Sequence, residues 1–235
     1  MKLAQALFTQ GFGTRREVAA LVAAGQVAVA GRVVDDPQAE VDPDGLVLTV
    51  EGRDWPFHER AVVLLHKPAG YECSSKPSAW PGVTTLLPLP LRRRGVQPVG
   101  RLDQDTTGAL LLTDDGGLIH RLTSPKRHVA KVYQVQTARP VTDEQLQALR
   151  DGVVLRDDPV PVRAAAVSRT GECALQLVLT EGRYHQVRRM VAATGNHVDA
   201  LHRSAFGPVR LPPELAPGQW CWVDAAVFDA PAAPG

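Results

Sequence analysis

The sequence has little that would place it in an oxidising compartment or in a membrane. It has only three cysteines, Cys73, Cys173 and Cys221, which lie far apart and form no C-x-x-C pair. Their number and spacing exclude a disulfide framework and a zinc finger as the basis of the fold. The first residues lack the long apolar core of a signal peptide, and no run of about 18 apolar residues occurs. We therefore expect a cytoplasmic protein that does not contact the membrane.

An excess of charge of one sign is also absent. The 26 Lys and Arg residues and the 25 Asp and Glu residues leave a formal net charge of +1. This balance excludes a polycation that binds nucleic acid over its whole surface, so any RNA contact must come from local basic patches. The 44% of apolar residues and 22% of charged residues are typical of a protein with a sizeable core.

Composition along the chain of 235 residues predicts two domains. Residues 1–50 form a small α+β unit, the polar residues 51–60 a linker, and residues 61–230 a larger domain. Residues 74–98, rich in proline and basic side chains, are expected to be loop, and the Ala- and Pro-rich residues 231–235 a disordered tail. Strands dominate the larger domain, with few helices between them. This pattern favours an α+β fold with a largely antiparallel, mixed sheet over a doubly wound one.

Helix and strand signals are clear in both domains. Thr14 with Glu17, and Thr142 with Gln145, are capping boxes that predict helix starts. Other apolar patterns predict a hairpin at 27–34, a strand at 47–50, strands at 61–65, 109–113, 131–137 and 173–180, and helices near 3–7, 118–122 and 185–193. Arg15 and Arg16 fall in the first helical turn after Thr14, where cations oppose the helix dipole. Two guanidiniums beside free backbone N–H groups can bind phosphate. Alternatively, Arg15 and Arg16 are solvated residues of a basic turn without a ligand.

The most informative segment is GRLDQDTTG at residues 100–108. It places Asp103 in a turn at the mouth of the apolar run 109–113. Asp103 and Asp105 can be two turn carboxylates without further function. With three later residues they also match part of a calcium-loop pattern, but no helix pair flanks this loop.

Other segments offer partners for Asp103. An enzyme that acts on RNA through one carboxylate needs a cation that keeps it ionised, an aromatic ring for the base and a group that fills the gap in the RNA stack. Arg188 or Arg189, Tyr133 and Arg101 can supply these three parts. Taken alone, Tyr133 is typical of a core aromatic residue and Arg188 of a surface cation.

Residues 1 to about 48 resemble the S4 RNA-binding domain. The resemblance rests on a basic residue and a leucine at the start, on TRRE at residues 14–17, and on the spacing of Gly25, Val27, Val29 and Gly31. The chain departs from the usual pattern at Ala4, where an aspartate often occurs.

Four motifs follow one another in the larger domain: HKPAG at 66–70, GRLDQDTTG at 100–108, KVY at 131–133 and EGRYHQVRRM at 181–190. Together they resemble the pseudouridine synthases of the branch that modifies ribosomal RNA, over residues 62 to about 227. The segments KPAGYECS, TSP, and GNHV followed by LHR bring the resemblance closer to the bacterial synthases that act on 16S rRNA. Synthases acting on 23S rRNA share most of these motifs.

The resemblance implies that Asp103 is the catalytic carboxylate, that Tyr133 stacks on the target uracil and that Arg188 pairs with Asp103. The RNA contacts it implies come from Arg101, which takes the place of the extruded base, and from Arg15, Arg16, Lys131, Arg183, His185 and Gln186. The reaction is an isomerisation of a specific uridine, so neither a cofactor nor a metal is expected. The expected partner is 16S rRNA, either naked or in a partly assembled small subunit, and the expected state is a monomer.

Two other classes of protein stay open at this point. A non-catalytic RNA-binding or ribosome-assembly protein would use the S4-like unit alone. A glycoside hydrolase would usually need two cooperating carboxylates, and only Asp103 has supporting residues in this sequence.

Overall fold

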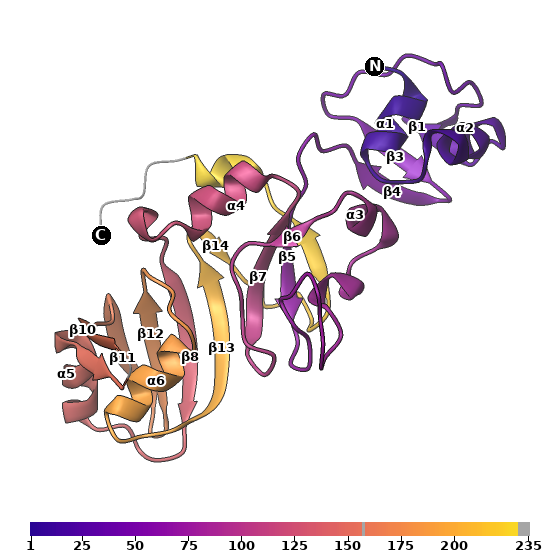
Figure 1. Ribbon diagram of the computed structural model, residues 1–235. Coiled ribbons are helices and arrows are strands. Elements are labelled where there is room, and N and C mark those ends of the chain that lie inside the picture. The colour runs from indigo at the N-terminus through magenta and orange to yellow at the C-terminus, as the bar shows by residue number, and fades with distance from the viewer. Residues whose placement is uncertain (157, 230–235) are drawn as a thin grey trace. The chain divides into compact units, whose positions relative to one another are not determined.

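The computed structural model describes residues 1–156 and 158–229 (Figure 1). The chain divides into two compact units. Unit 1 comprises Met1–Ala61 and Thr84–Gln97, and unit 2 comprises Val62–Val83 and the chain from Pro98 onward. Among the described residues, no helix is both long enough and apolar enough to cross a membrane. The tail predicted at 231–235 lies outside the described residues.

Unit 1 packs helices against a sheet of order β2-β1-β3-β4. Its elements are α1 (Leu3–Thr9), α2 (Arg15–Ala23), β1 (Val27–Val29), β2 (Arg32–Val33), β3 (Val47–Val50), β4 (Arg53–Pro56) and α3 (Leu89–Arg93). The predicted capping box is present, because the Thr14 side chain accepts from Glu17 N and the Glu17 side chain accepts from Thr14 N. The predicted hairpin and the strand at 47–50 are confirmed as β1, β2 and β3.

Two segments of unit 1 differ from the sequence predictions. Residues 51–60 are not a free linker, because β4 pairs with β3 and its Trp55 is buried opposite Leu48. A single apolar residue among polar ones gave no strand pattern. Residues 74–98 are not all loop, because α3 begins after Pro88 and buries Leu91 completely. Two of the prolines that suggested a loop, Pro88 and Pro90, stand at the helix start, where the fixed φ of proline fits.

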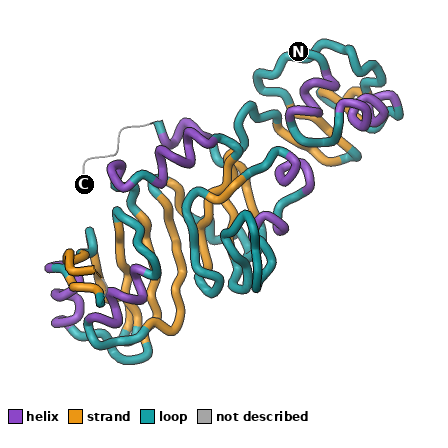
Figure 2. The backbone as a smooth tube through the Cα atoms, viewed as in Figure 1, coloured by secondary structure: helices purple, strands orange, loops and turns teal. Residues whose placement is uncertain are grey.

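Unit 2 is built on a sheet of order β11-β12-β8-β13-β7-β5-β15, with β14 beside β13. Figure 2 shows its strands in orange. The elements are β5 (Val62–Lys67), β7 (Thr107–Thr113), α4 (Gly116–Thr123), β8 (Lys131–Thr137), α5 (Asp143–Asp151), β9 (Val153–Leu155), β10 (Asp158–Val162), β11 (Ala166–Gly171), β12 (Ala174–Leu179), α6 (Gln186–Ala193), β13 (Val198–Phe206), β14 (Val209–Arg210) and β15 (Trp220–Trp222). The short strand β6 (Gln97–Pro98) lies at the boundary of the two units, and 3-10 turns occupy Val83–Leu86, Pro125–Arg127 and Ala225–Phe228.

The sheet of unit 2 is mixed. Strand β13 runs parallel to β7, whereas it runs antiparallel to β8, and the pairs β12–β8, β11–β12, β5–β7 and β15–β5 are also antiparallel. This arrangement confirms the predicted α+β fold with a largely antiparallel sheet.

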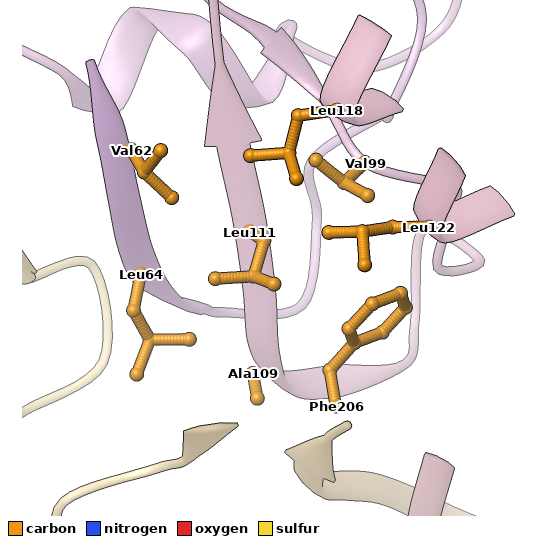
Figure 3. Close-up of a cluster of buried hydrophobic side chains, with 8 residues drawn as sticks. All are labelled: Val62, Leu64, Val99, Ala109, Leu111, Leu118, Leu122 and Phe206. Carbon is orange, nitrogen blue, oxygen red and sulfur yellow. The ribbon is translucent and has the colours of Figure 1, made fainter. Parts of the chain in front are cut away.

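Strand β7 is the centre of the core of unit 2. Its residues from Gly108 to Thr113 are all buried, which explains the continuous apolar run. Helix α4 covers one side and places Leu118 and Leu122 against Leu111 and Phe206 (Figure 3). A rigid strand therefore follows directly after the turn that carries Asp103.

Candidate active site

Gly108 lets strand β7 run very close to strand β13. Its φ is +109°, and a Cβ atom at this position would clash with the main-chain oxygen of Arg203. In the register of the sheet, Gly108 lies opposite Arg203, and Arg203 lies opposite Tyr133 on β8. Figure 1 shows the three strands side by side. The glycine that ends GRLDQDTTG therefore brings the turn before β7 to the level of Tyr133.

Lys67 fastens this turn to the sheet. Its side chain is completely buried at the end of β5. The ammonium nitrogen Nζ donates hydrogen bonds to the main-chain oxygens of Pro68 (3.0 Å), Gln104 (3.1 Å) and Thr106 (2.9 Å). Two of these acceptors belong to the turn itself, so the lysine fixes the backbone on both sides of Asp105.

The carboxylates of the turn also act on the pKa of Lys67. Burial lowers the pKa of Lys67, while Cys73, Asp105 and Asp103 act in the opposite direction. The sequence reasoning included Lys67 in a motif but assigned it no role. One signal in the sequence could have indicated a structural role for Lys67. It follows a run of aliphatic residues typical of a buried strand, and a lysine at the end of such a strand needs hydrogen-bond acceptors from the protein.

Asp103 is held by an imidazole. Its main-chain oxygen accepts a hydrogen bond from Thr106 N at 3.1 Å, which closes the turn. Its carboxylate oxygen Oδ1 lies 3.3 Å from Nε2 of His185, and 33% of the Asp103 side chain is exposed. The carboxylate is thus fixed by one neighbour and still accessible to a ligand. His185, expected as an RNA contact, lies against Asp103.

Arg188 does not pair with Asp103 as the sequence predicted. Its Nη2 lies 2.8 Å from Oδ2 of Asp105, and its Nη1 donates to the main-chain oxygen of Val198 at 3.0 Å. The hydrogen bond to Val198 anchors the guanidinium of Arg188 at the start of β13. From there the guanidinium contacts Asp105 and not Asp103. Asp105, expected only to shape the turn, links it to α6.

Tyr133 and Lys131 are more enclosed than RNA contacts on an open surface. Tyr133 is only 9% exposed and lies between Leu177 of β12 and Arg203 of β13. The Nζ atom of Lys131 donates to the main-chain oxygen of Val129 at 3.0 Å. Burial, with a smaller contribution from the positive charge of Arg203, lowers the pKa of Lys131 to about 8.

Arg183 and Gln186 both hold the turn before α6. Arg183 pairs with Asp158 and, at 3.5 Å, with Glu181. Gln186 is buried, donates to Glu181 Oε1 at 2.9 Å and accepts from Arg183 N at 2.7 Å. These two expected RNA contacts therefore stabilise the segment that carries His185.

Arg101 is exposed, two residues before Asp103. Its positive charge acts on the nearby Glu72. Backbone N–H donors at Ala79, Ser78 and Trp80 are the main reason that the pKa of Glu72 is lowered, and Arg101 adds to the effect. The exposed position leaves Arg101 accessible to a nucleic acid.

Arg15 and Arg16 of unit 1 are also exposed, in the first turn of α2. The guanidinium carbon of Arg15 lies 5.3 Å from the centre of the Phe8 ring, a cation–π distance. Both side chains keep their hydrogen-bond donors accessible to a phosphate at the helix start.

The described part of unit 2 thus brings together Asp103, His185, Asp105 and Arg188 around one fixed turn. The carboxylate of Asp103, one-third exposed on this fixed turn, suits nucleophilic attack or proton abstraction at a carbon atom of a ligand. Residues 1–156 and 158–229 contain no group of three or more His, Cys, Asp or Glu side chains that is suited to a metal ion.

Comparison with known families matches both units. The profile of the RNA pseudouridylate synthase family matches residues 61–193, and that of the S4 domain matches residues 1–47. The first match contains Asp103, Tyr133, His185 and Arg188.

Individual relatives match over nearly the whole chain. An RNA pseudouridine synthase of Bacillus subtilis, described as uncharacterised, is 40% identical over 94% of this chain and 93% of its own length. Ribosomal small subunit pseudouridine synthase A of Escherichia coli K12 is 37% identical over 90% of this chain and 91% of its own length. A crystal structure of a pseudouridylate synthase, 32% identical, covers 97% of this chain and 98% of its own, with a TM-score of 0.69.

Proposed function

This chain belongs to the RNA pseudouridylate synthase family, and we propose that its substrate is a specific uridine in the 16S rRNA of the small ribosomal subunit. Relatives named for small-subunit modification, at 37% identity over 90% of the chain, support this choice of RNA. The S4 domain match supports a second RNA contact outside the catalytic domain. The proposed partner is the rRNA itself, either naked or in a partly assembled subunit.

The proposed reaction rearranges one nucleotide without adding or removing atoms. The bond between the ribose C1′ and the uracil N1 breaks, the base turns over, and a bond forms between C1′ and C5. The C5 proton is lost and N1 gains one, so the product is an isomer of the substrate. The carboxylate of Asp103 acts at the sugar, either by adding to C1′ or by accepting a sugar proton. Neither route requires an oxidant, a group donor or a cofactor.

The observation that carries this proposal is the setting of Asp103. It is one-third exposed, on a turn that Lys67 holds through Gln104 and Thr106. A carboxylate that must meet a flipped-out nucleotide needs this combination of access and fixed position. The second carboxylate of the turn is engaged by Arg188.

Other residues have proposed roles around the nucleotide. Tyr133 contacts the target uracil, and the exposed Arg101 takes the space that the base leaves in the RNA. Arg188 is a positioning residue that acts through Asp105. Arg15 and Arg16 bind phosphates of the RNA.

Release of tritium from 5-tritiated uridine tests the proposal, because the C5 proton is lost in the reaction. Transcripts of the small-subunit and large-subunit rRNA are compared with the same enzyme preparation. We expect release from the small-subunit transcript alone. Release only from the large-subunit transcript would contradict the substrate, and release from neither transcript nor from partly assembled subunits would contradict the reaction. Release from the assembly intermediate alone would identify it as the substrate form.

A further inference from the structure

Tyr184 is a large ring that stands almost free at the edge of the catalytic turn. Its side chain is 76% exposed, more than any other large apolar side chain of the described residues. One face of the ring is covered by the imidazole of His185, with the centroids 3.8 Å apart and the planes 18° from parallel. The other face is open to a ligand, and an exposed aromatic face is costly to leave in water.

The Tyr184–His185 stack is fixed at the start of α6. His185 is the N-cap residue of that helix and has a φ of +48°, in the left-handed region. Arg189, one turn into the helix, donates from Nη1 to the main-chain oxygen of Tyr184 at 3.0 Å. The two rings are therefore held by the backbone and not only by their contact with each other.

The stack leads directly to the catalytic carboxylate. The edge of the His185 ring places Nε2 3.3 Å from Oδ1 of Asp103, while its face lies against Tyr184. The imidazole therefore lies between the ring of Tyr184 and the carboxylate of Asp103, in contact with both.

We propose that Tyr184 stacks on an unpaired base that neighbours the target uridine, and that His185 is a positioning residue coupling this contact to Asp103. The inference rests on the proposed function, since removal of a nucleotide from the stack leaves its neighbours with an uncovered face. The chemistry around the ring favours a nucleotide over an apolar peptide. The imidazole of His185 stacks on the ring, and Arg189 donates to the main-chain oxygen of Tyr184, so the setting is polar and suits a base with polar edges.

A matched pair of variants at Tyr184 tests the stacking. Tyr184→Phe keeps the ring, and Tyr184→Leu keeps an apolar side chain without it. We expect KM for the rRNA to rise about 5- to 150-fold in Tyr184→Leu, with a smaller change in kcat, and to stay within about twofold in Tyr184→Phe. Equal KM values for the two variants would overturn the stacking. Because the side chain is exposed, both variants should unfold at the wild-type temperature.

His185→Asn tests the coupling, because asparagine tolerates the left-handed backbone but cannot stack on Tyr184. We expect kcat to fall tenfold or more, beyond any fall in Tyr184→Leu, at an unchanged unfolding temperature. A kcat equal to that of the wild type would overturn the positioning role.

The same pair at Tyr184 is also examined on an Asp103→Asn background, where Kd for the transcript is measured without turnover. A 5- to 150-fold weaker Kd for the Tyr184→Leu form alone supports the stacking even if the wild type released no tritium. Failure of the proposed function and failure of this inference are therefore distinguishable.

Discussion

Helices α2 and α6 each carry two adjacent arginines near their N-terminal ends, but the surroundings of the two pairs differ. At α2, the capping box of Thr14 and Glu17 satisfies the helix start from within the local sequence. Arg15 and Arg16 are left exposed. The hydrogen bonds of this cap join residues only three positions apart.

At α6, no side chain caps the helix start, and His185 adopts the left-handed conformation instead. Arg188 reaches Asp105 in another segment, and Arg189 returns to the main-chain oxygen of Tyr184. The guanidiniums of α6 are thus engaged by protein atoms before any ligand arrives.

We therefore expect the two pairs of arginines to have different roles, one in binding RNA and one in fixing the geometry of neighbouring residues. An exposed arginine contributes to RNA binding through phosphate charge, and salt weakens that contribution. An anchored arginine contributes by fixing the geometry of its neighbours, which salt affects less. Substitutions in the two regions should therefore change different measured quantities.

The largest expected effect distinguishes the two carboxylates of the turn. Asp103→Asn should lower turnover by on the order of 10⁴-fold with RNA binding retained, because it removes the carboxylate that we propose acts at the sugar. Asp105→Asn weakens only the contact with Arg188 and should cost about 10- to 100-fold. Tritium release under single-turnover conditions measures both. Equal losses in the two variants would contradict the separate roles.

The next effect concerns the lysine that holds the turn. Lys67→Met leaves three main-chain oxygens without their buried donor and should lower the free energy of unfolding by about 3 kcal/mol. Denaturant unfolding checks this value. Lys76→Met, at an exposed position, is the matched control and should change it by less than about 0.5 kcal/mol. A similar small change in Lys67→Met would show that the three contacts contribute little.

The arginines of α2 should affect affinity and its salt dependence. Replacing both Arg15 and Arg16 by alanine should reduce the slope of log Kd against log salt by about one to two, with stability unchanged. Titration of the transcript at several salt concentrations measures the slope. Arg188→Ala is the comparison variant and should lower kcat while leaving the slope nearly as it is. The distinction between exposed and anchored arginines fails if both variants change the slope equally.

The last effect is a dependence of stability on alkaline pH. Burial lowers the pKa of Lys131 from 10.5 to about 8, so between these values the unfolded chain binds more protons than the folded one. The contribution of Lys131 to stability is therefore full above pH 10.5 and declines as the pH falls towards 8. Unfolding curves of the wild type and Lys131→Met across this range should diverge, with the wild type gaining more on raising the pH. Parallel curves would contradict the shifted pKa.

Local signals in the sequence predicted most elements of both units. The capping boxes at Thr14 and Thr142 are present in the structure, because their bonds join residues three positions apart. The strand predicted at 173–180 is confirmed as β12, and Leu175, Leu177 and Leu179 form its buried face.

The two failures in unit 1 share one physical cause. Strand β4 exists because β3 offers it a hydrogen-bonding edge, and α3 is stabilised where Leu91 becomes buried. Neither partner is visible in the local pattern, since a polar strand and a proline-rich helix look like linker and loop. Propensity is a weak guide where distant packing decides.

The sequence by itself determined the order of the motifs, and with it the family, the α+β class and Asp103 as the candidate carboxylate. Only the tertiary structure decided which basic side chain meets which carboxylate: His185 lies against Asp103, and Arg188 pairs with Asp105 from 83 positions away. The physical reason is reach. A side chain spans a few ångströms, so its partner depends on the angle at which α6 and β13 approach the turn, and on the main-chain oxygen of Val198 that anchors Arg188 there.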